Sequence, residues 1–251
     1  MIVAVAPPTL ASFWPGAAGV TMPSLPQRLE TATVRFWESG LPTLGEDLAA
    51  GVAFWQGFHA IKALAAMALL AAVTALGVAV WGGYARAEGR KRRVALLAAG
   101  ILGAPIPVVV LLIAIANLQG AIVPLSSAIS LLPIGDQSSA SASAVAQIKD
   151  QLQVGSHSEP LMVLLNDFAA YHSTVAVLLL LACCALSAVT VALWVKRAKT
   201  SRTAVRLRRV LTAIPIALLP LIAGLALLAV ANLETAADPV GPMLGFYLGG
   251  R

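Results

Sequence analysis

A run of 23 residues with at most one strongly charged member occurs twice in this chain. It extends from His59 to Trp81 and recurs from His172 to Trp194, with the same first and last residue. Lys62 is the charged residue of the first copy. A helix of about 20 apolar residues crosses the hydrocarbon core of a bilayer, because each residue adds about 1.5 Å. Each copy is therefore long enough to form a transmembrane helix.

The composition places the whole chain in the integral membrane class. Of its 251 residues, 59% are hydrophobic and 11% are charged, and the mean hydropathy is +0.87. Soluble domains carry about 25% charged residues. No ten-residue alternation of apolar and polar residues indicates a membrane barrel, and helices satisfy their own backbone groups in lipid. We therefore predict an all-α protein with four transmembrane helices, at about 55–84, 94–118, 173–195 and 209–233.

The distribution of charge predicts the orientation of these helices. Of the 17 Lys and Arg residues, five lie in 86–93 and seven in 196–209, whereas all acidic residues except Glu88 lie elsewhere. Cytoplasmic loops of membrane proteins are enriched in Lys and Arg. We therefore expect both basic loops in the cytoplasm and both termini outside, in a multi-pass protein of a bacterial cytoplasmic (inner) membrane. The net charge of +6 then indicates contact with the lipid bilayer or a cytosolic partner rather than with nucleic acid.

The two halves match at a shift of 113–116 residues, which predicts an internal duplication. Gly, Pro, His, Trp and Asn residues carry the match: Gly40 with Gly155, His59 with His172, Trp81 with Trp194, Pro105 with Pro220, and Asn117 with Asn232. Each unit contains two spans, so both enter the membrane the same way up, as a parallel repeat. We expect a flexible N-terminal tail at 1–23, a first repeat at 24–135 and a second at 136–251.

The segments between the spans predict short extracytoplasmic amphipathic helices. Leu25, Leu29, Ala32 and Phe36 share one helical face after a capping serine, Ser24, in a helix expected to end near Gly40. A second such helix is expected at 142–154, after a Ser-rich linker at 136–143. Residues 119–135 are apolar but interrupted by prolines, which indicates an outer segment packed on the mouth of the bundle, and an outer tail follows the last span.

Two sets of residues predict how the spans pack and bend. Small residues at intervals of four form matching ridges that allow close helix contact, at the bundle centre or against an oligomer partner. The ridge residues are Ala71, Ala75, Ala79, Cys184, Ala188 and Ala192. Prolines inside spans remove a backbone hydrogen bond and kink the helix. The expected kinks are at Pro105, Pro107, Pro215 and Pro220.

No catalytic or cofactor motif stands out. His59 and His172 occupy matching depths, and together with Asp167 they are weak candidates for a metal site; the expectation is that no metal or cofactor binds. Lys62 lies close enough to the end of its span to extend to the interface. No Ser-His-Asp arrangement, HExxH or glycine-rich phosphate loop is present.

These observations favour a non-enzymatic protein. The first hypothesis is a scaffold or accessory subunit of a bacterial cell-envelope membrane complex, which interacts with other membrane proteins or forms a homo-oligomer. The alternative is a small channel or transporter for an apolar or lipid substrate, suggested by the proline-containing second and fourth spans. A metal-dependent enzyme or sensor on the outer face, using His59 and His172, is a third possibility.

Overall fold

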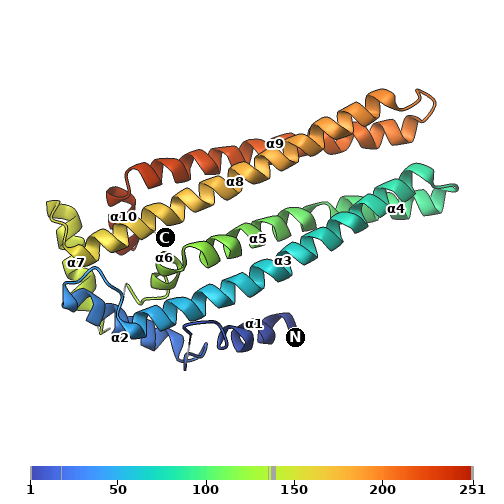
Figure 1. Cartoon of the computed structure of the whole chain (residues 1–251). Helices are drawn as coiled ribbons and strands as arrows, with labels where there is room; N and C mark the ends of the chain where they lie inside the picture. The colour runs from blue at the N-terminus through green and yellow to red at the C-terminus, as the bar shows by residue number, and fades with distance from the viewer. Residues whose placement is uncertain (1, 18, 135, 137–139, 250–251) are drawn as a thin grey trace. The chain divides into compact units, whose positions relative to one another are not determined.

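The computed structural model describes residues 2–17, 19–134, 136 and 140–249 of the chain. Within these residues it is all-helical (Figure 1). The short helices are α1 (Ile2–Ala11), α2 (Leu25–Ser39), α4 (Arg90–Gly103), α5 (Pro105–Ile122), α6 (Pro124–Ile129), α7 (Ala142–Val154) and α10 (Val240–Tyr247). The long ones are α3 (Glu46–Arg86), α8 (Glu159–Lys199) and α9 (Val205–Ala237). Residues 137–139 of the predicted linker, and the predicted repeat ends at 135 and 251, lie outside the described residues.

Four helical segments are long and apolar enough to cross a membrane, which confirms the predicted number of spans. They are α3, α4 with α5, α8 and α9. Each contains the span that the sequence predicted. Both α3 and α8 have 41 residues, about 60 Å of helix, which is longer than a hydrocarbon core of about 30 Å.

The second span is interrupted beside its prolines, whereas the fourth span is not. The second span is divided at Ala104, because α4 ends at Gly103 and α5 begins at Pro105. A proline is tolerated at the first position of a helix, where its missing N–H has no partner to lose. In contrast, α9 continues through Pro215 and Pro220 as one helix.

The chain forms two compact units, each built from segments of both halves. Unit 1 comprises residues 1–63, 116–175 and 231–251, and unit 2 comprises 64–115 and 176–230. The long helices α3 and α8 contribute their N-terminal parts to unit 1 and their C-terminal parts to unit 2. Unit 2 contains both basic loops, whereas unit 1 contains the short helices α2, α6, α7 and α10.

Unit 1 has a continuous hydrophobic core. Leu25, Leu29, Ala32 and Phe36, the face predicted for α2, are all buried in it. Other helices add Phe54, Leu125, Ile148, Leu161 and Tyr247. Gly40 ends α2 with a left-handed φ of 65°, and Gly155 ends α7 with a φ of 73°. Glycine adopts this conformation without steric cost, so both helices stop where the sequence predicted.

The described part of the segment expected to be a flexible tail packs within unit 1. The last residue of its helix α1, Ala11, lies in the core, and so do Ala17 and Val20 after it. The Trp14 ring lies directly on Gly57 of α3, where a Cβ would come within 2.6 Å of it. The sequence of this segment has no helical period of apolar residues that would predict its packing. The packing uses the space that Gly57 leaves on α3.

The predicted serine cap of α2 does not form, whereas the start of α7 is bonded to a carboxylate distant in the chain. Ser24 makes no capping hydrogen bond to α2, and its hydroxyl donates to the Thr21 carbonyl. At the start of α7, the Ser141 N–H and hydroxyl both donate to Oε1 of Glu30, each at 3.1 Å. A carboxylate is stabilised at a helix N-terminus, so this contact joins α2 to α7.

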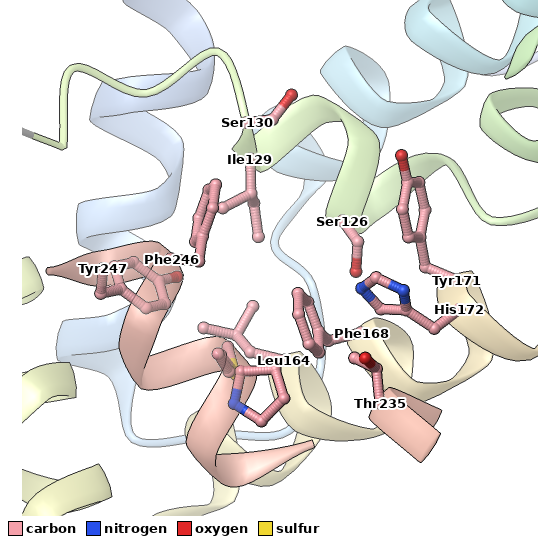
Figure 2. A pocket seen from close by; sticks show the side chains of 12 residues that line it. Ser126, Ile129, Ser130, Leu164, Phe168, Tyr171, His172, Thr235, Phe246 and Tyr247 are labelled. Atoms are coloured by element: carbon pink, nitrogen blue, oxygen red, sulfur yellow. The ribbon is translucent and has the colours of Figure 1, made fainter. Parts of the chain in front are cut away.

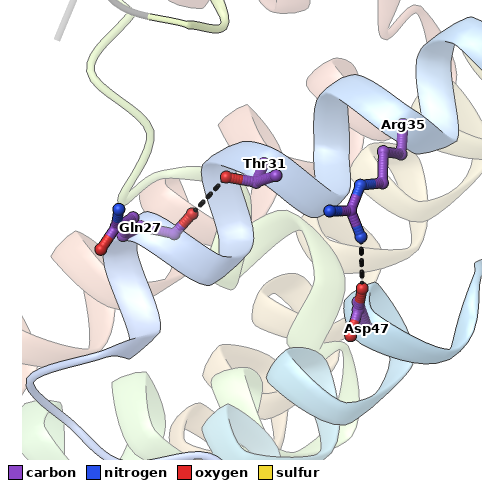
Figure 3. A network of polar contacts seen from close by, with 4 residues as sticks. All are labelled: Gln27, Thr31, Arg35 and Asp47. Atoms are coloured by element: carbon purple, nitrogen blue, oxygen red, sulfur yellow. Dashed lines mark hydrogen bonds and ion pairs between the residues drawn. The ribbon is translucent and has the colours of Figure 1, made fainter.

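An exposed ion pair joins α2 to α3 (Figure 3). Nη1 of Arg35 lies 2.6 Å from Oδ2 of Asp47, and the two side chains are 66% and 63% exposed. An ion pair this exposed contributes about 0–1 kcal/mol. Burial in the core, rather than this pair, therefore holds α2 on α3.

In unit 2 each helical hairpin has its own contacts. Trp81 of α3 packs on Gly100 of α4, where a Cβ would lie 2.8 Å from the indole ring. The Arg197 side chain of α8 donates to the Thr212 hydroxyl of α9 at 2.6 Å. All six residues of the predicted small-residue ridges are exposed. Their exposed surface leaves room for contact with a partner, which stays a prediction.

Candidate functional site

Each hairpin contains a histidine–asparagine pair in unit 1. Nδ1 of His59 lies 3.1 Å from Oδ1 of Asn117, and Nδ1 of His172 lies 2.8 Å from Oδ1 of Asn232. An amide oxygen only accepts hydrogen bonds, so Nδ1 is the donor in both pairs. In a neutral imidazole Nε2 is then left as an acceptor. The sequence comparison aligned His59 with His172 and Asn117 with Asn232. The structure shows that within each hairpin the histidine is hydrogen-bonded to the asparagine.

The two imidazoles have aromatic neighbours at equivalent positions in the sequence. Trp55 and Phe58 contact the His59 ring, with centroids 4.6 and 5.5 Å away. Phe168 and Tyr171 contact the His172 ring at 4.6 and 5.4 Å. The pattern aromatic-x-x-aromatic-His thus occurs at both sites. It is visible in the sequence, where it would have indicated that each histidine belongs to an aromatic cluster.

The two sites differ on the far side of the ring. In the first hairpin the imidazole of His59 lies on the backbone of Gly120, and its Nε2 is buried without a partner. The second hairpin has Thr235 three residues after Asn232, where the first has Gly120 three residues after Asn117. Here His172 and Thr235 line a pocket. One site is therefore closed by tight packing and the other is open.

We expect a Gly120→Ala substitution to destabilise the first site. A Cβ at position 120 would lie 2.7 Å from Cγ of His59, and overpacking of this kind costs about 1–3 kcal/mol. The matched control is Gly77→Ala in α3, where no atom lies within 4 Å of the added Cβ and alanine favours the helix by up to about 1 kcal/mol. Thermal unfolding in detergent micelles should show a lower midpoint for the first variant only, and equal midpoints would contradict the close contact.

The open site is a pocket of about 330 Å³ in unit 1 (Figure 2). Four helices line it: α6, α8, α9 and α10. Figure 2 shows Ser126, Tyr171, His172 and Thr235 on one side and Phe246 and Tyr247 across from them. The remaining lining residues are Ile129, Ser130, Leu164, Phe168, Pro242 and Met243. The described lining thus has a polar side and an apolar side, with no Lys, Arg, Asp or Glu among its residues.

Asp167 holds Ser126, a residue of the polar side, through two hydrogen bonds. Its Oδ2 accepts a hydrogen bond from the Ser126 N–H at 2.7 Å and another from the Ser126 hydroxyl at 2.6 Å. Ser126 is the third residue of α6, so the carboxylate caps the first turn of that helix from α8. The role of this carboxylate is to fix α6 against α8 and to orient Ser126.

The three metal candidates do not form a common site. Within the described residues no group of three His, Cys, Asp or Glu side chains is placed to hold a metal ion. Asp167 is engaged by Ser126, and each histidine uses Nδ1 toward its own asparagine. Lys62 is placed over the Phe58 ring, with Nζ 4.8 Å from the centroid. These contacts favour roles in packing and orientation for all four residues.

The apolar side of the pocket includes a buried tyrosine, Tyr247. Tyr247 is 1% exposed, and burial raises the pKa of its phenol above the ordinary value. Tyrosine is already neutral at physiological pH at its ordinary pKa of about 10, so the Tyr247 phenol is neutral here, and its ring forms part of the wall opposite His172. Sequence reasoning missed it, because α10 lies in a short Gly- and Pro-containing segment that was expected to be an outer tail.

No protein family model, curated protein or solved structure matches this chain.

Proposed function

We propose that this protein is a non-enzymatic scaffold or accessory subunit of a bacterial cell-envelope membrane complex. The observation that carries the proposal is the packed core of unit 1. It contains residues from α2, α3, α6, α7, α8 and α10, and so ties the ends of both hairpins into one folded body. A fold held this way presents a fixed surface beside the membrane, as a subunit that positions other proteins requires.

The spans themselves offer surface to neighbours. Of the 18 most apolar consecutive residues of α3, only 11% are buried within the chain. For α8 the share is 22%. The ridge residues Ala75 and Ala188 are exposed among them. Small residues let the backbones of two helices approach closely in a membrane. These faces suit helices of other membrane proteins or of a second copy of this chain.

The internal duplication is part of the proposal. It is supported by the equal lengths of α3 and α8, by the left-handed glycines before them, and by the two histidine–asparagine pairs. We propose that a hairpin with its preceding amphipathic helix was duplicated. The halves then diverged at positions such as Gly120 and Thr235, which close one site and open the other.

We also propose that both termini lie outside the cytoplasmic membrane. The basic loops at 86–93 and 196–209 belong to unit 2, whereas unit 1 carries ten of the 11 acidic residues. This distribution of charge along the chain suits cytoplasmic basic loops and extracytoplasmic acidic segments. Labelling of a cysteine at Arg202 by an impermeant reagent added outside intact cells would contradict it.

The alternative function is a small channel or transporter for an apolar or lipid substrate. It is favoured by the division of the second span at Ala104 and by the pocket beside His172. A transporter requires that this pocket connect to a path along the spans. Transport of labelled lipid by the purified protein in liposomes would support this alternative over the first.

The scaffold proposal is tested by purification from native membranes. We expect tagged protein in mild detergent to bring down a partner in stoichiometric amount, identified by mass spectrometry. Ala75→Leu should reduce the yield of partner, because it enlarges a residue of the ridge. Ala65→Leu is the matched control: it is an exposed alanine of α3 outside the ridge. A solitary monomer, or a partner retained equally by both variants, would count against the proposed contact.

A further inference from the structure

We propose that the pocket beside His172 binds a single-chain lipid with an uncharged, hydroxyl-bearing head group, of the monoacylglycerol class. The inference goes beyond the scaffold role and stands whether or not the protein moves lipid. It depends on three properties of the pocket: its size and position, the separation of its polar and apolar sides, and the hydrogen-bonding capacity of the polar side.

The size and position suit a lipid with one chain. The volume of about 330 Å³ lies at the lower end of the range of about 300–1,000 Å³ for small-molecule pockets. His172 immediately precedes the apolar run 173–195, and Thr235 follows the run 209–233 by two residues. The pocket thus lies where the apolar parts of α8 and α9 end, at the depth of lipid head groups in a spanning helix.

The two sides match the two parts of an amphiphile. Ser126, His172 and Thr235 provide polar groups on one side, and Figure 2 places Phe246 and Tyr247 opposite them. Leu164 and Met243 are buried at the apolar side. An acyl chain that enters this side from the bilayer leaves one apolar environment for another, so the apolar side contributes packing contacts and shape rather than a transfer energy from water.

Most polar groups of the pocket are left as hydrogen-bond acceptors. The hydroxyl of Ser126 donates to Asp167, that of Ser130 to the Ser127 carbonyl, and that of Thr235 to the Ala231 carbonyl. Nδ1 of His172 donates to Asn232. The hydroxyl oxygens of Ser126, Ser130 and Thr235 and Nε2 of His172 can therefore accept from a ligand. The Tyr171 hydroxyl points away from the pocket (Figure 2) and lies beside Gln119.

The predominance of hydrogen-bond acceptors in the pocket selects the chemical class of the lipid head group. A carboxylate or phosphate would meet acceptors and no Lys or Arg side chain among the described lining residues. An ammonium would lose its hydration with no carboxylate lining the pocket, and an unpaired buried charge is costly. Hydroxyl groups donate to acceptors and carry no charge. A glycerol head with one acyl chain satisfies both conditions.

The test uses a monoacylglycerol with a photoreactive diazirine in its acyl chain, added to the full-length protein in phosphatidylcholine nanodiscs. We expect saturable labelling of α10, mapped by mass spectrometry to peptides that contain Met243. The fatty acid with the same diazirine chain should label at least tenfold less at equal concentration. This comparison uses the wild-type protein and needs no variant to fold.

Two variants and a matched control locate the site. His172→Phe should weaken monoacylglycerol binding about five- to tenfold, the effect of one lost hydrogen bond. Met243→Trp should abolish labelling, because the indole fills the apolar side. His59→Phe, at the equivalent position on Gly120 outside the pocket, should leave labelling unchanged, and thermal unfolding checks that each variant folds.

Three results would overturn the proposal. Labelling spread over the spans without enrichment in α10 would show contact with bulk lipid only. Equal or stronger labelling by the fatty acid would exclude the uncharged head group. Labelling of Met243→Trp at the wild-type level would place the ligand elsewhere. None of these results depends on whether a partner protein co-purifies.

Discussion

Replacing Asp167 with alanine is expected to lower the free energy of unfolding by about 3 kcal/mol, because two hydrogen bonds from Ser126 lose their acceptor. The carboxylate is half-buried, so water replaces it poorly. The lost contact also frees the first turn of α6 from α8. Reversible unfolding in mixed micelles measures the change, and photolabelling of the pocket should weaken with it, since Ser126 lines the pocket.

The control for this substitution is Asp47→Ala. Asp47 also bonds at 2.6 Å, to Arg35, but both side chains are more than half exposed. Its loss should cost less than about 1 kcal/mol. Asp167→Asn should lie between wild type and Asp167→Ala, because an amide oxygen can still accept from Ser126. If the two alanine variants lose equal stability, then the capping role of Asp167 is refuted.

Phe54→Ala should cost about 3–5 kcal/mol, the range for removing a large aromatic side chain from a packed core. Phe54 is fully buried in unit 1, with 0% of its surface exposed. The cavity left behind would be surrounded by helices from both halves of the chain, so α2 and α7 should loosen together. Hydrogen exchange should accordingly increase in both helices.

Phe13→Ala serves as the matched change at an exposed site, since the Phe13 side chain is 82% exposed. It should alter stability by no more than about 0.5 kcal/mol. A small effect of Phe54→Ala, comparable to that of Phe13→Ala, would mean that unit 1 is not held by this core. The proposed scaffold role would then lose its main support.

Positions 54 and 167 are equivalent under the predicted duplication, because both precede the histidine of their hairpin by five residues. One is an apolar core residue and the other a helix-capping carboxylate. A sequence comparison of the halves therefore predicts where the helices run, but not what each equivalent position does. The same holds for Gly120 and Thr235, which stand beside equivalent histidines.

The local pattern of the sequence determined the helices and their ends. Long apolar runs predict the four spanning helices, and αL glycines at 40 and 155 end α2 and α7 as expected. The buried face of α2 was also predicted, since residues three and four apart lie on one side of a helix. These features depend on residues within a few turns of one another.

Tertiary structure alone decided the contacts between segments distant in the chain. Gly57 of α3 receives Trp14 at close range, and the segment predicted to be a flexible tail packs there. Asp167 was considered as a metal ligand, but it caps α6. The pocket needs α10 folded against α8 and α9, and no local pattern in a short Gly- and Pro-containing segment specifies that. Such contacts depend on which surfaces remain unpaired once the helices have formed, and hydrophobic burial, which is non-directional, then selects among them.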